Sequence, residues 1–283
     1  MKILITGSTG QVGHALVKNL INHQVVALTR NDCDLSKPDE IKRIIDHHIP
    51  DLIINPAAYT DVDQAETDKE QAYRINCDAP KLMALKAYEC DIPFIHFSTD
   101  YVFNGKKESS YEENDTTEPL GIYGESKLAG ENAIKEVGGQ FYIFRTSWVY
   151  SNIGRNFFLT MKKFSEEKDE LNIVSNQYGV PTSNHFIAQQ INKIIPFMDK
   201  GNTGIFHLVP DGECSWYEFA IQIIEKLNPN FDLKKISPID SKKYKSKAKR
   251  PQNSILSNKK VKKVFMLKFK HWKTELEELI YET

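Results

Sequence analysis

The stretch KILITGSTGQVG, residues 2–13, joins a short apolar run to three glycines that are spaced three residues apart. The apolar run is typical of a buried strand, and the residues after Val12 have the apolar spacing of a helix. Between them lie Gly7, Gly10 and Gly13. Glycine permits a tight turn and lets the backbone approach a pyrophosphate, which can bind at a helix N-terminus. The stretch therefore predicts a dinucleotide-binding turn at the start of a parallel α/β sheet.

The alternation of strand and helix continues through the first half of the chain. Further apolar runs are VVALT, DLIINPAAY, IPFIHFSTD and FYIFRTSWVY, and helical stretches separate them. Continuous apolar strands between helices are typical of a parallel sheet that is covered on both faces. We therefore predict an α/β fold, with a Rossmann-type doubly wound parallel sheet over residues 1–150.

Beyond Trp148 the alternation loosens. Helical patterns occur in NFFLTMKKFSEEKD, FIAQQINKIIPFM and SWYEFAIQIIEKL, the last with Ser215 as its cap, while LNIVSNQYG and GIFHLVP are strand-like. We expect residues 151–283 to form mainly a smaller C-terminal substrate-binding lobe. Two segments, Leu171 to Ser175 and Phe186 to Phe197, are expected to return to the first domain.

Composition excludes several classes of function. The formal net charge is -1, so no global field favours nucleic acid or an anionic membrane surface. No window approaches the ~18–20 apolar residues of a membrane span. The four cysteines are scattered without a CxxC pair, which argues against disulfides and zinc and favours a reducing, cytoplasmic location.

The end of the second predicted strand bears on the choice of nucleotide. An acidic residue there accepts the 2′-hydroxyl of NAD, whereas an arginine favours the 2′-phosphate of NADP. The sequence has Thr29 and Arg30 at this point, with Asp32 and Asp34 later. Arg30 therefore favours NADP(H), and an ordinary solvent-facing loop arginine is the alternative.

A hydroxyl, a phenol and an ammonium are predicted to converge beside this nucleotide. Thr99 ends the fourth strand, and Tyr123 and Lys127 lie one turn apart on one helix face. This set suits carbonyl reduction, in which hydride adds to carbon while an acid protonates oxygen. We expect the lysine cation to lower the tyrosine pKa and Thr99 to polarise the carbonyl. Taken alone, the Tyr–Lys pair favours by a wide margin an amphipathic side chain beside a solvated one.

Several motifs together resemble a known family. GSTGQVG, STDYVF (residues 98–103) and YGESK resemble the extended short-chain dehydrogenase/reductases. NPAAYTDVDQAE, PLGIYGESKLAGE, FRTSWVY, NQYGVPT and RPQNSIL narrow the resemblance to the dTDP-4-dehydrorhamnose reductase family. The resemblance implies an NADPH-dependent enzyme, with NADH possible. It would reduce the C4 keto group of a dTDP-linked 4-keto-6-deoxy sugar, dTDP-6-deoxy-L-lyxo-4-hexulose, to give dTDP-L-rhamnose.

The glycine turn and the resemblance together assign residue roles. Thr99, Tyr123 and Lys127 would be catalytic, with Tyr123 as the general acid. Tyr123 and Lys127 would also contact the cofactor. The other cofactor contacts would be Gly7, Thr9, Gly10, Gln11, Val12, Gly13, Arg30, Asp34, Leu35, Ala57, Ala58, Tyr59, Thr60 and Asn76. Substrate contacts would be Thr99, Asp100, Tyr101, Trp148 and Arg250. Without the resemblance, Trp148 is ordinary packing, Asn76 a local backbone contact and Arg250 a solvated cation.

Three alternatives stay open. Relatives with a divalent ion at a dimer contact need an acidic ligand, but His14 and Ala15 supply none, so we expect no metal, while a homodimer stays open. Some relatives carry an acid where Thr29 or Arg30 stands, which is the departure that points to NADPH. The alternative functions are another nucleotide-sugar 4-ketoreductase, an epimerase, or a non-catalytic regulatory subunit of the same fold.

Overall fold

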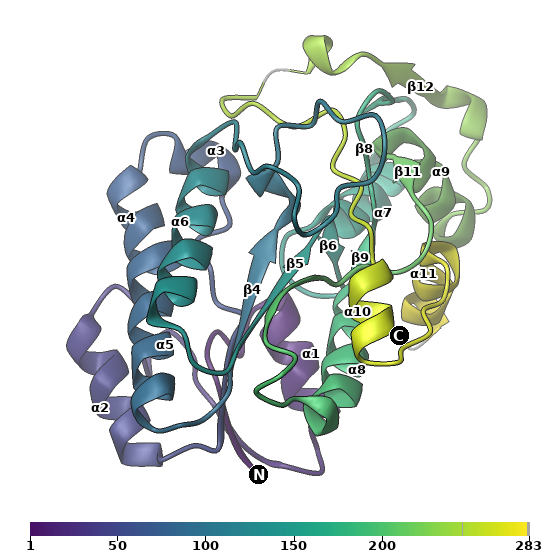
Figure 1. Cartoon of the computed structure of the whole chain (residues 1–283). Coiled ribbons are helices and arrows are strands. Elements are labelled where there is room, and N and C mark those ends of the chain that lie inside the picture. Colours follow the sequence, from purple (N-terminus) through teal and green to yellow (C-terminus); the bar gives the residue numbers. More distant parts are fainter. Residues whose placement is uncertain (245, 282–283) are drawn as a thin grey trace.

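A parallel sheet of six strands lies at the centre of the computed structural model, which describes residues 1–244 and 246–281 (Figure 1). The strand order is β10-β5-β4-β3-β1-β2, and each neighbouring pair is parallel. The sheet confirms the predicted α/β fold. Its strands are β1 (Lys2–Ile5), β2 (Gln24–Ala27), β3 (Leu52–Asn55), β4 (Phe94–Thr99), β5 (Phe141–Thr146) and β10 (Gly204–His207).

The strand order fixes where a ligand can bind. The chain leaves β1 toward β2 on one side and returns to β3 on the other, so the connections diverge at the carboxyl ends of β1 and β3. In doubly wound sheets, ligands bind in the crevice at such a switch point. The glycine turn follows β1 directly, so the predicted dinucleotide turn lies at this crevice.

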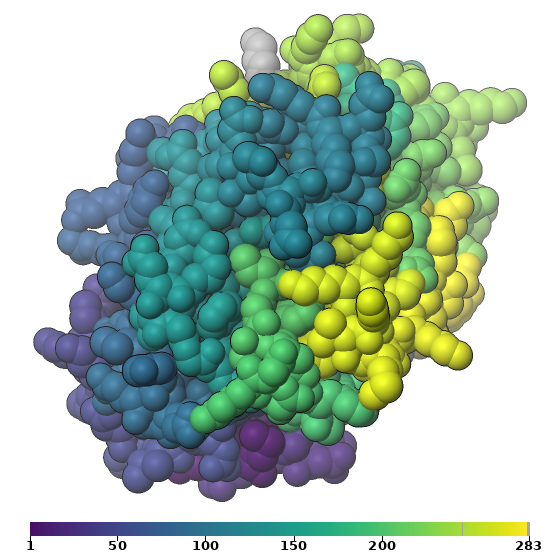
Figure 2. Space-filling view, in the orientation of Figure 1, coloured from purple at the N-terminus to yellow at the C-terminus, as the bar shows by residue number. Residues whose placement is uncertain are grey.

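Helices cover both faces of the sheet, as Figure 1 shows. One apolar core lies between the sheet and α1, α8 and α10, and the other lies between the sheet and α2, α5 and α6. In Figure 2 the yellow C-terminal segment lies against the green and teal middle of the chain. The helix bounds are α1 (Gln11–Asn19), α2 (Pro38–His48), α5 (Ala79–Glu89), α6 (Ile122–Val137), α8 (Asn184–Ile194) and α10 (Lys259–Val264).

A π turn interrupts the long helical stretch before α5. Helix α4 (Lys69–Tyr73) continues through the π turn at Arg74–Asp78 into α5, so this stretch is helical as predicted. The π turn buries the side chain of Asn76 completely. The backbone carbonyl of Asn76 packs on Gly130 of α6, and a Cβ added to Gly130 would lie 2.1 Å from the carbonyl oxygen. The two helices therefore approach closely at Asn76, and π turns often occur at functional sites.

A smaller lobe is built around a separate apolar core that includes Tyr150, Phe219 and Trp272. The capping box at Ser215, which begins α9, confirms the predicted cap. The lobe contains three two-stranded sheets and three of the remaining helices. Its elements are β6 (Val149–Tyr150) with β9 (Thr182–Ser183), β8 (Tyr178–Gly179) with β11 (Cys214–Ser215), β7 (Leu171–Val174) with β12 (Ile236–Ile239), and helices α7 (Phe157–Glu167), α9 (Trp216–Leu227) and α11 (Trp272–Tyr281).

The second half returns to the central sheet differently from the sequence expectation. Helix α8 packs on α1 as expected for Phe186 to Phe197, and β10 adds a sixth strand beside β5. The expectation for Leu171 to Ser175 is wrong, because β7 pairs with β12 and its side chains join the core of the lobe. Short apolar strands have the same pattern in either setting, so periodicity alone does not separate them.

The predicted strand FYIFRTSWVY is broken near its end. Trp148 has a positive φ of 47°, so β5 ends at Thr146 and the short β6 continues in another direction. A positive φ is uncommon for a bulky side chain and often occurs at functional sites. In the described part of the chain, no helix is long and apolar enough to cross a membrane.

Candidate active site

The glycine turn after β1 is shaped by two close approaches. Gly7 has a positive φ of 56°, and a Cβ on it would lie 2.9 Å from Cβ of Ala57 in the loop after β3. A Cβ on Gly13 would lie 2.2 Å from the carbonyl oxygen of Gly7. Only glycine fits these positions without moving backbone. The turn therefore leaves its backbone open at the N-terminus of α1, as binding of a pyrophosphate requires.

A cavity of about 570 Å³ runs from this turn to the start of α6. It contains most of the predicted cofactor residues and two of the three predicted catalytic residues. These are Gly7, Thr9, Gly10, Gln11, Val12, Gly13, Arg30, Asp34, Leu35, Ala57, Ala58, Thr60, Tyr123 and Lys127. A single cavity thus joins the glycine turn to the Tyr–Lys pair.

Two predicted cofactor residues, Tyr59 and Asn76, lie behind the wall of this cavity. The Asn76 side chain accepts a hydrogen bond from Tyr59 N (2.9 Å) and donates to Tyr59 O (3.1 Å). It also donates to Ser126 Oγ at 3.0 Å. Asn76 therefore fixes the backbone between Ala58 and Thr60, both of which line the cavity.

Sequence reasoning missed several residues of the wall. Gly154 and Arg155 come from the loop before α7, and Gln11 ties that loop to the glycine turn, because its Oε1 accepts from Ser151 Oγ (2.8 Å) and Asn156 Nδ2 (2.9 Å). The run GRN, residues 154–156, could have predicted this part of the wall, because it places a cation beside the Asn156 cap of α7. The other missed lining residues are Cys33, Pro56, Ile75, Phe97, Ser98, Thr146 and Val149.

The acidic residues after β2 are engaged locally. Asp32 Oδ2 accepts from the backbone and the hydroxyl of Thr29, at 2.9 and 2.6 Å. Asp34 Oδ1 accepts from Ser36 N (3.0 Å) and Ser36 Oγ (2.8 Å), and these bonds lower the Asp34 pKa. Arg30 lines the cavity beside them. This end of the cavity therefore presents a guanidinium, and the nearby carboxylates of Asp32 and Asp34 are held in turns.

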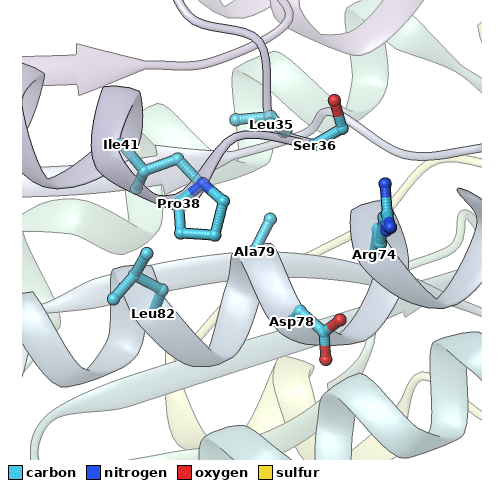
Figure 3. Close-up of a pocket in the computed structure, with 8 residues that line it drawn as sticks. All are labelled: Leu35, Ser36, Pro38, Ile41, Arg74, Asp78, Ala79 and Leu82. Atoms are coloured by element: carbon cyan, nitrogen blue, oxygen red, sulfur yellow. The ribbon is translucent and has the colours of Figure 1, made fainter.

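Leu35 also borders a second cavity, of about 330 Å³, on the outer side of the same loop (Figure 3). Pro38 and Ile41 of α2 form one wall, and Arg74 and Asp78 of the π turn form another. Ser36, Ala79 and Leu82 complete the lining. The loop after β2 thus lies between two cavities.

Tyr123 lies in the first turn of α6, half-buried beside Thr99 and Tyr101. Burial raises its pKa to about 12, a hydrogen bond with the Thr99 side chain acts in the opposite direction, and the Asp100 charge adds to the rise. Its ring meets that of Tyr101 edge-on, with centroids 5.5 Å apart. Tyr123 therefore keeps its proton at neutral pH, as a proton donor must.

The Lys127 ammonium is directed toward His96 and Phe97. Its side chain is 2% exposed, and its Nζ donates to Phe97 O at 2.6 Å and lies 3.2 Å from His96 Nε2. Burial lowers the Lys127 pKa to about 7, while the Glu131 charge acts in the opposite direction. The expectation that Lys127 lowers the pKa of Tyr123 is wrong here, because that pKa rises and the ammonium is directed toward His96 and Phe97.

The depressed Lys127 pKa predicts how stability depends on pH. An unfolded lysine titrates near ~10.4, so between about pH 7 and 10 the unfolded chain binds more protons and stability rises with pH. Lys127→Met lacks this term. We expect wild type to gain about 2 kcal/mol relative to Lys127→Met between pH 7 and 9, measured by urea unfolding. Parallel pH dependences for the two proteins would contradict the buried lysine; Lys18→Met, on an exposed site, is the control.

The predicted substrate residues after β4 form a tight turn. Thr99 Oγ1 accepts from Tyr101 N at 3.2 Å and donates to Asp100 Oδ1 at 3.0 Å. Burial raises the pKa of Asp100 to about 6, and burial also raises the pKa of Tyr101. The turn places Thr99 beside Tyr123. It therefore brings the predicted hydroxyl and phenol together.

Trp148 is held between the sheet and the lobe. Its ring stacks on Trp216 of α9 at a centroid distance of 3.5 Å and an angle of 8°. Gly179 packs on the ring, since a Cβ there would lie 2.4 Å from Trp148 Cε2. Sequence reasoning identified Trp148 and missed Trp216, whose position on an amphipathic helix is typical of core packing.

Arg250 lies in a separate basic cavity of about 330 Å³, close to Leu120 at the start of α6. Its Nη2 is 3.4 Å from Asp63 Oδ2, and its guanidinium lies 5.8 Å from the Tyr244 ring centroid. The other lining residues are Val174, Gln177, Ser241, Lys242, Tyr244, Ser246, Lys247, Ala248 and Lys249. Lys242, Lys247 and Lys249 of the basic run thus border one hollow with Arg250, and all three lysines are exposed.

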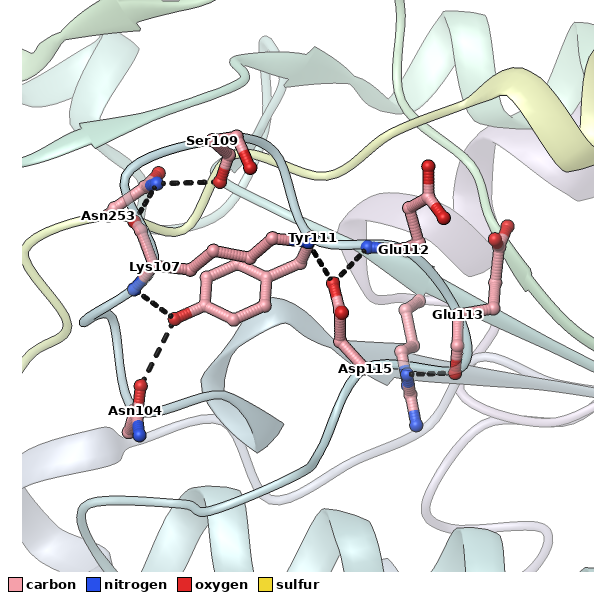
Figure 4. Close-up of polar contacts among 9 residues, drawn as sticks. Asn104, Lys107, Ser109, Tyr111, Glu112, Glu113, Asp115 and Asn253 are labelled. Atoms are coloured by element: carbon pink, nitrogen blue, oxygen red, sulfur yellow. Dashed lines mark hydrogen bonds and ion pairs between the residues drawn. The ribbon is translucent and has the colours of Figure 1, made fainter.

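The loop between Thr99 and Tyr123 is held in place by the late motif RPQNS (Figure 4). Asn253 Nδ2 donates to the carbonyls of Lys107 (2.6 Å) and Ser109 (3.0 Å). The Tyr111 hydroxyl accepts from Lys107 N and donates to Asn104 Oδ1, both at 3.1 Å. These bonds hold the segment around Asn253 against the loop that follows β4.

A buried ion pair joins β5 to α6, the helix that carries Tyr123 and Lys127. Arg145 of β5 makes a two-pronged contact with Glu131 of α6, at 2.8 and 2.6 Å, and both side chains are at most 2% exposed. Glu131 Oε1 also accepts from Ser98 Oγ at 2.5 Å. Across the described ranges 1–244 and 246–281, no group of three or more His, Cys, Asp and Glu is placed to hold a metal ion.

Comparison with known proteins agrees with this arrangement. Residues 1–283 match the family described as the RmlD substrate binding domain. A dTDP-4-dehydrorhamnose reductase of Burkholderia thailandensis is 38% identical over 285 residues, covering 96% of each chain. The spore coat polysaccharide biosynthesis protein SpsK of Bacillus subtilis is 36% identical, covering 99% of this chain and 97% of that one. A crystal structure of dTDP-4-dehydrorhamnose reductase from Bacillus anthracis in complex with NADP superposes with a TM-score of 0.93 at 32% identity, covering 100% of this chain and 99% of that chain.

Proposed function

The chain belongs to the RmlD substrate binding domain family, and from this premise we propose that it is an NADPH-dependent dTDP-4-dehydrorhamnose reductase. The reaction is reduction of the C4 keto group of dTDP-6-deoxy-L-lyxo-4-hexulose to give dTDP-L-rhamnose. One observation supports it most: a single cavity contains the glycine turn at one end and Tyr123 with Lys127 at the other.

The residues of the cavity fit a dinucleotide. A Cβ at Gly7 would meet Ala57 and one at Gly13 would meet the Gly7 carbonyl, so glycine is what lets the turn fold this tightly while it lines the cavity. The turn and α1 would hold the pyrophosphate, Arg30 the 2′-phosphate, and the wall from Ala57 to Thr60 the adenosine side. The bound cofactor supplies hydride to the substrate carbon.

The chain supplies the proton and the orientation. Tyr123 would donate its phenolic proton to O4, and Thr99, hydrogen-bonded to Tyr123, would orient the same oxygen. The high pKa of Tyr123 keeps that proton in place until the oxygen becomes strongly basic. The cofactor would supply the hydride and Tyr123 the proton, to the carbon and the oxygen of the same carbonyl group.

The lobe would bind the rest of the substrate. Residues 1–150 would bind the cofactor, and residues 151–283 would form mainly the substrate lobe, with α8 and β10 returning to the sheet. Asp100, Tyr101 and Trp148 would contact the sugar. Arg250 and its lysine-lined hollow fit a diphosphate, since a guanidinium can bind two oxygens at once. We also propose a cytoplasmic location, since all four cysteines are free thiols.

The proposal is tested by steady-state reduction of the dTDP-linked keto-sugar with NADPH and with NADH. We expect stoichiometric NADPH oxidation, and slower oxidation of NADH because Arg30 has no phosphate to bind. An epimerase would convert the sugar without net NADPH consumption. A regulatory subunit would show neither reaction, and either of these results would reject the proposal.

A further inference from the structure

A chain of buried polar groups runs behind Lys127, away from the cavity. His96 Nε2 lies 3.2 Å from Lys127 Nζ, and His96 Nδ1 lies 3.1 Å from Asn55 Nδ2. Asn55 Oδ1 accepts from Thr6 Oγ1 at 2.5 Å. The exposed fraction is 2% for Lys127 and Thr6 and 0% for His96 and Asn55. These four residues connect the segment after β1 with β3, β4 and α6, and all of their side chains are almost completely buried.

The hydrogen-bonding capacity of imidazole restricts this chain to two proton arrangements. A neutral imidazole has one donor nitrogen and one acceptor nitrogen. If Lys127 is an ammonium, His96 Nε2 must accept and Nδ1–H must donate, which requires the Asn55 amide to turn so that its oxygen faces Nδ1 and its Nδ2 faces Thr6 Oγ1. If Lys127 is a neutral amine, Nε2–H can donate to it, and Nδ1 accepts from Asn55 Nδ2. The histidine tautomer and the lysine charge therefore change together.

The neighbouring groups keep His96 neutral. A second cation beside an ammonium is unfavourable, and burial together with Lys127 holds the His96 pKa well below its usual range. Glu131, one turn along α6, is the carboxylate whose charge acts on Lys127, and it is bound by Arg145 of β5 and Ser98 of β4. Tyr123 lies one turn earlier, and Asn55 and Thr6 carry no charge. Proton changes in this chain therefore concern Lys127.

We propose that His96 is a positioning residue for Lys127, holding its ammonium through Nε2 and matching each change of lysine charge by a change of tautomer. The inference rests on the proposed reductase function for its effect on rate. Lys127 lines the cavity, and in its charged form it would attract the hydroxyls of the cofactor and help to orient it beside Tyr123. His96 thus determines the pH range in which the active site is ready to react.

The pH profile of kcat/KM tests this role, because it reports ionisations of the free enzyme. His96→Phe fills similar space but leaves the ammonium only the Phe97 carbonyl as an acceptor, so the ammonium is disfavoured. We expect the alkaline limb to shift down by about one pH unit, which corresponds to a bond of about 1.4 kcal/mol to a charged donor. His96→Gln keeps an acceptor at similar reach and should restore the wild-type limb. Identical profiles for all three proteins would overturn the proposal.

A second measurement is independent of catalysis. In cofactor-free wild type labelled with ¹⁵N-histidine, the chemical shifts of the two His96 ring nitrogens should report a change of tautomer near pH 7. The same shifts should show no such change in Lys127→Met. Persistence of the change in Lys127→Met, or its absence in wild type, would overturn the Lys127–His96 coupling even if His96→Phe fails to fold. If the tautomer change occurs but no keto-sugar is reduced, the coupling stands and the proposed function fails.

Discussion

Arg145→Met is expected to lower the free energy of unfolding by about 3–5 kcal/mol, because it leaves the carboxylate of Glu131 buried without its partner. Glu131 is 0% exposed and would keep only the hydroxyl of Ser98 as a donor among the bonds described above. Methionine fills much of the volume of the arginine stem, so lost packing is a smaller part of the effect. Urea unfolding of both proteins at neutral pH measures the difference.

Two controls separate the buried charge from a general effect of removing arginine. Arg74→Met removes an exposed partner of Glu70 and should change stability by no more than about 0.5 kcal/mol. The double variant Glu131→Leu/Arg145→Met removes both charges and should recover most of the loss, because paired charges are costly to desolvate. A double variant as unstable as Arg145→Met would assign the effect to packing instead.

Tyr123→Phe is expected to reduce turnover by about 100-fold or more, the low end of acid catalysis, while cofactor affinity stays nearly unchanged. The phenolic oxygen is the only atom removed, and the ring keeps its contact with Tyr101. Steady-state kcat with NADPH and the keto-sugar measures the first effect. Titration of NADPH by fluorescence measures the second.

The matched control is Tyr73→Phe, which removes a phenol from α4, in the same apolar cluster but away from the cavity lining. It should leave kcat within about a factor of two, as for most substitutions away from a site. Turnover near that of wild type in Tyr123→Phe would reject Tyr123 as the proton donor. That result would not affect the fold or the proposed cofactor site.

The central sheet could be predicted because its strands carry the signal on their own. β1, β3 and β4 are buried on both faces, so each is a mainly apolar run, broken in β4 only by His96, that ends at a glycine, proline or polar residue. The two-residue strands of the lobe carry no such signal, since two residues show no period. Pairing between distant segments, as for β10 beside β5 or β7 beside β12, depends on tertiary packing that one sequence does not reveal.

The site could be predicted where the chemistry is carried by a local motif. The glycine turn and the Tyr123 helix line one cavity as expected, because each is fixed by its own strand and helix. The direction of the Lys127 side chain could not be predicted, because His96, Asn55 and Thr6 come from three other elements. The lone histidine in the apolar run FIHF was the one available hint of that buried partner.

The π turn before α5 constrains the length of the chain more than the identity of its residues. A π turn holds one residue more than the α-helical pattern, so deleting one residue between 74 and 78 would let the helix close with ordinary bonds. An ordinary helix would then absorb the missing residue within the turn itself, so α4 and α5 would keep their faces while the residues of the turn would be displaced. The helix would survive, but the amide of Asn76 would no longer meet Tyr59, and one wall of the cavity would be released. Functional homologues should therefore conserve the residue count across this turn even where they vary its sequence.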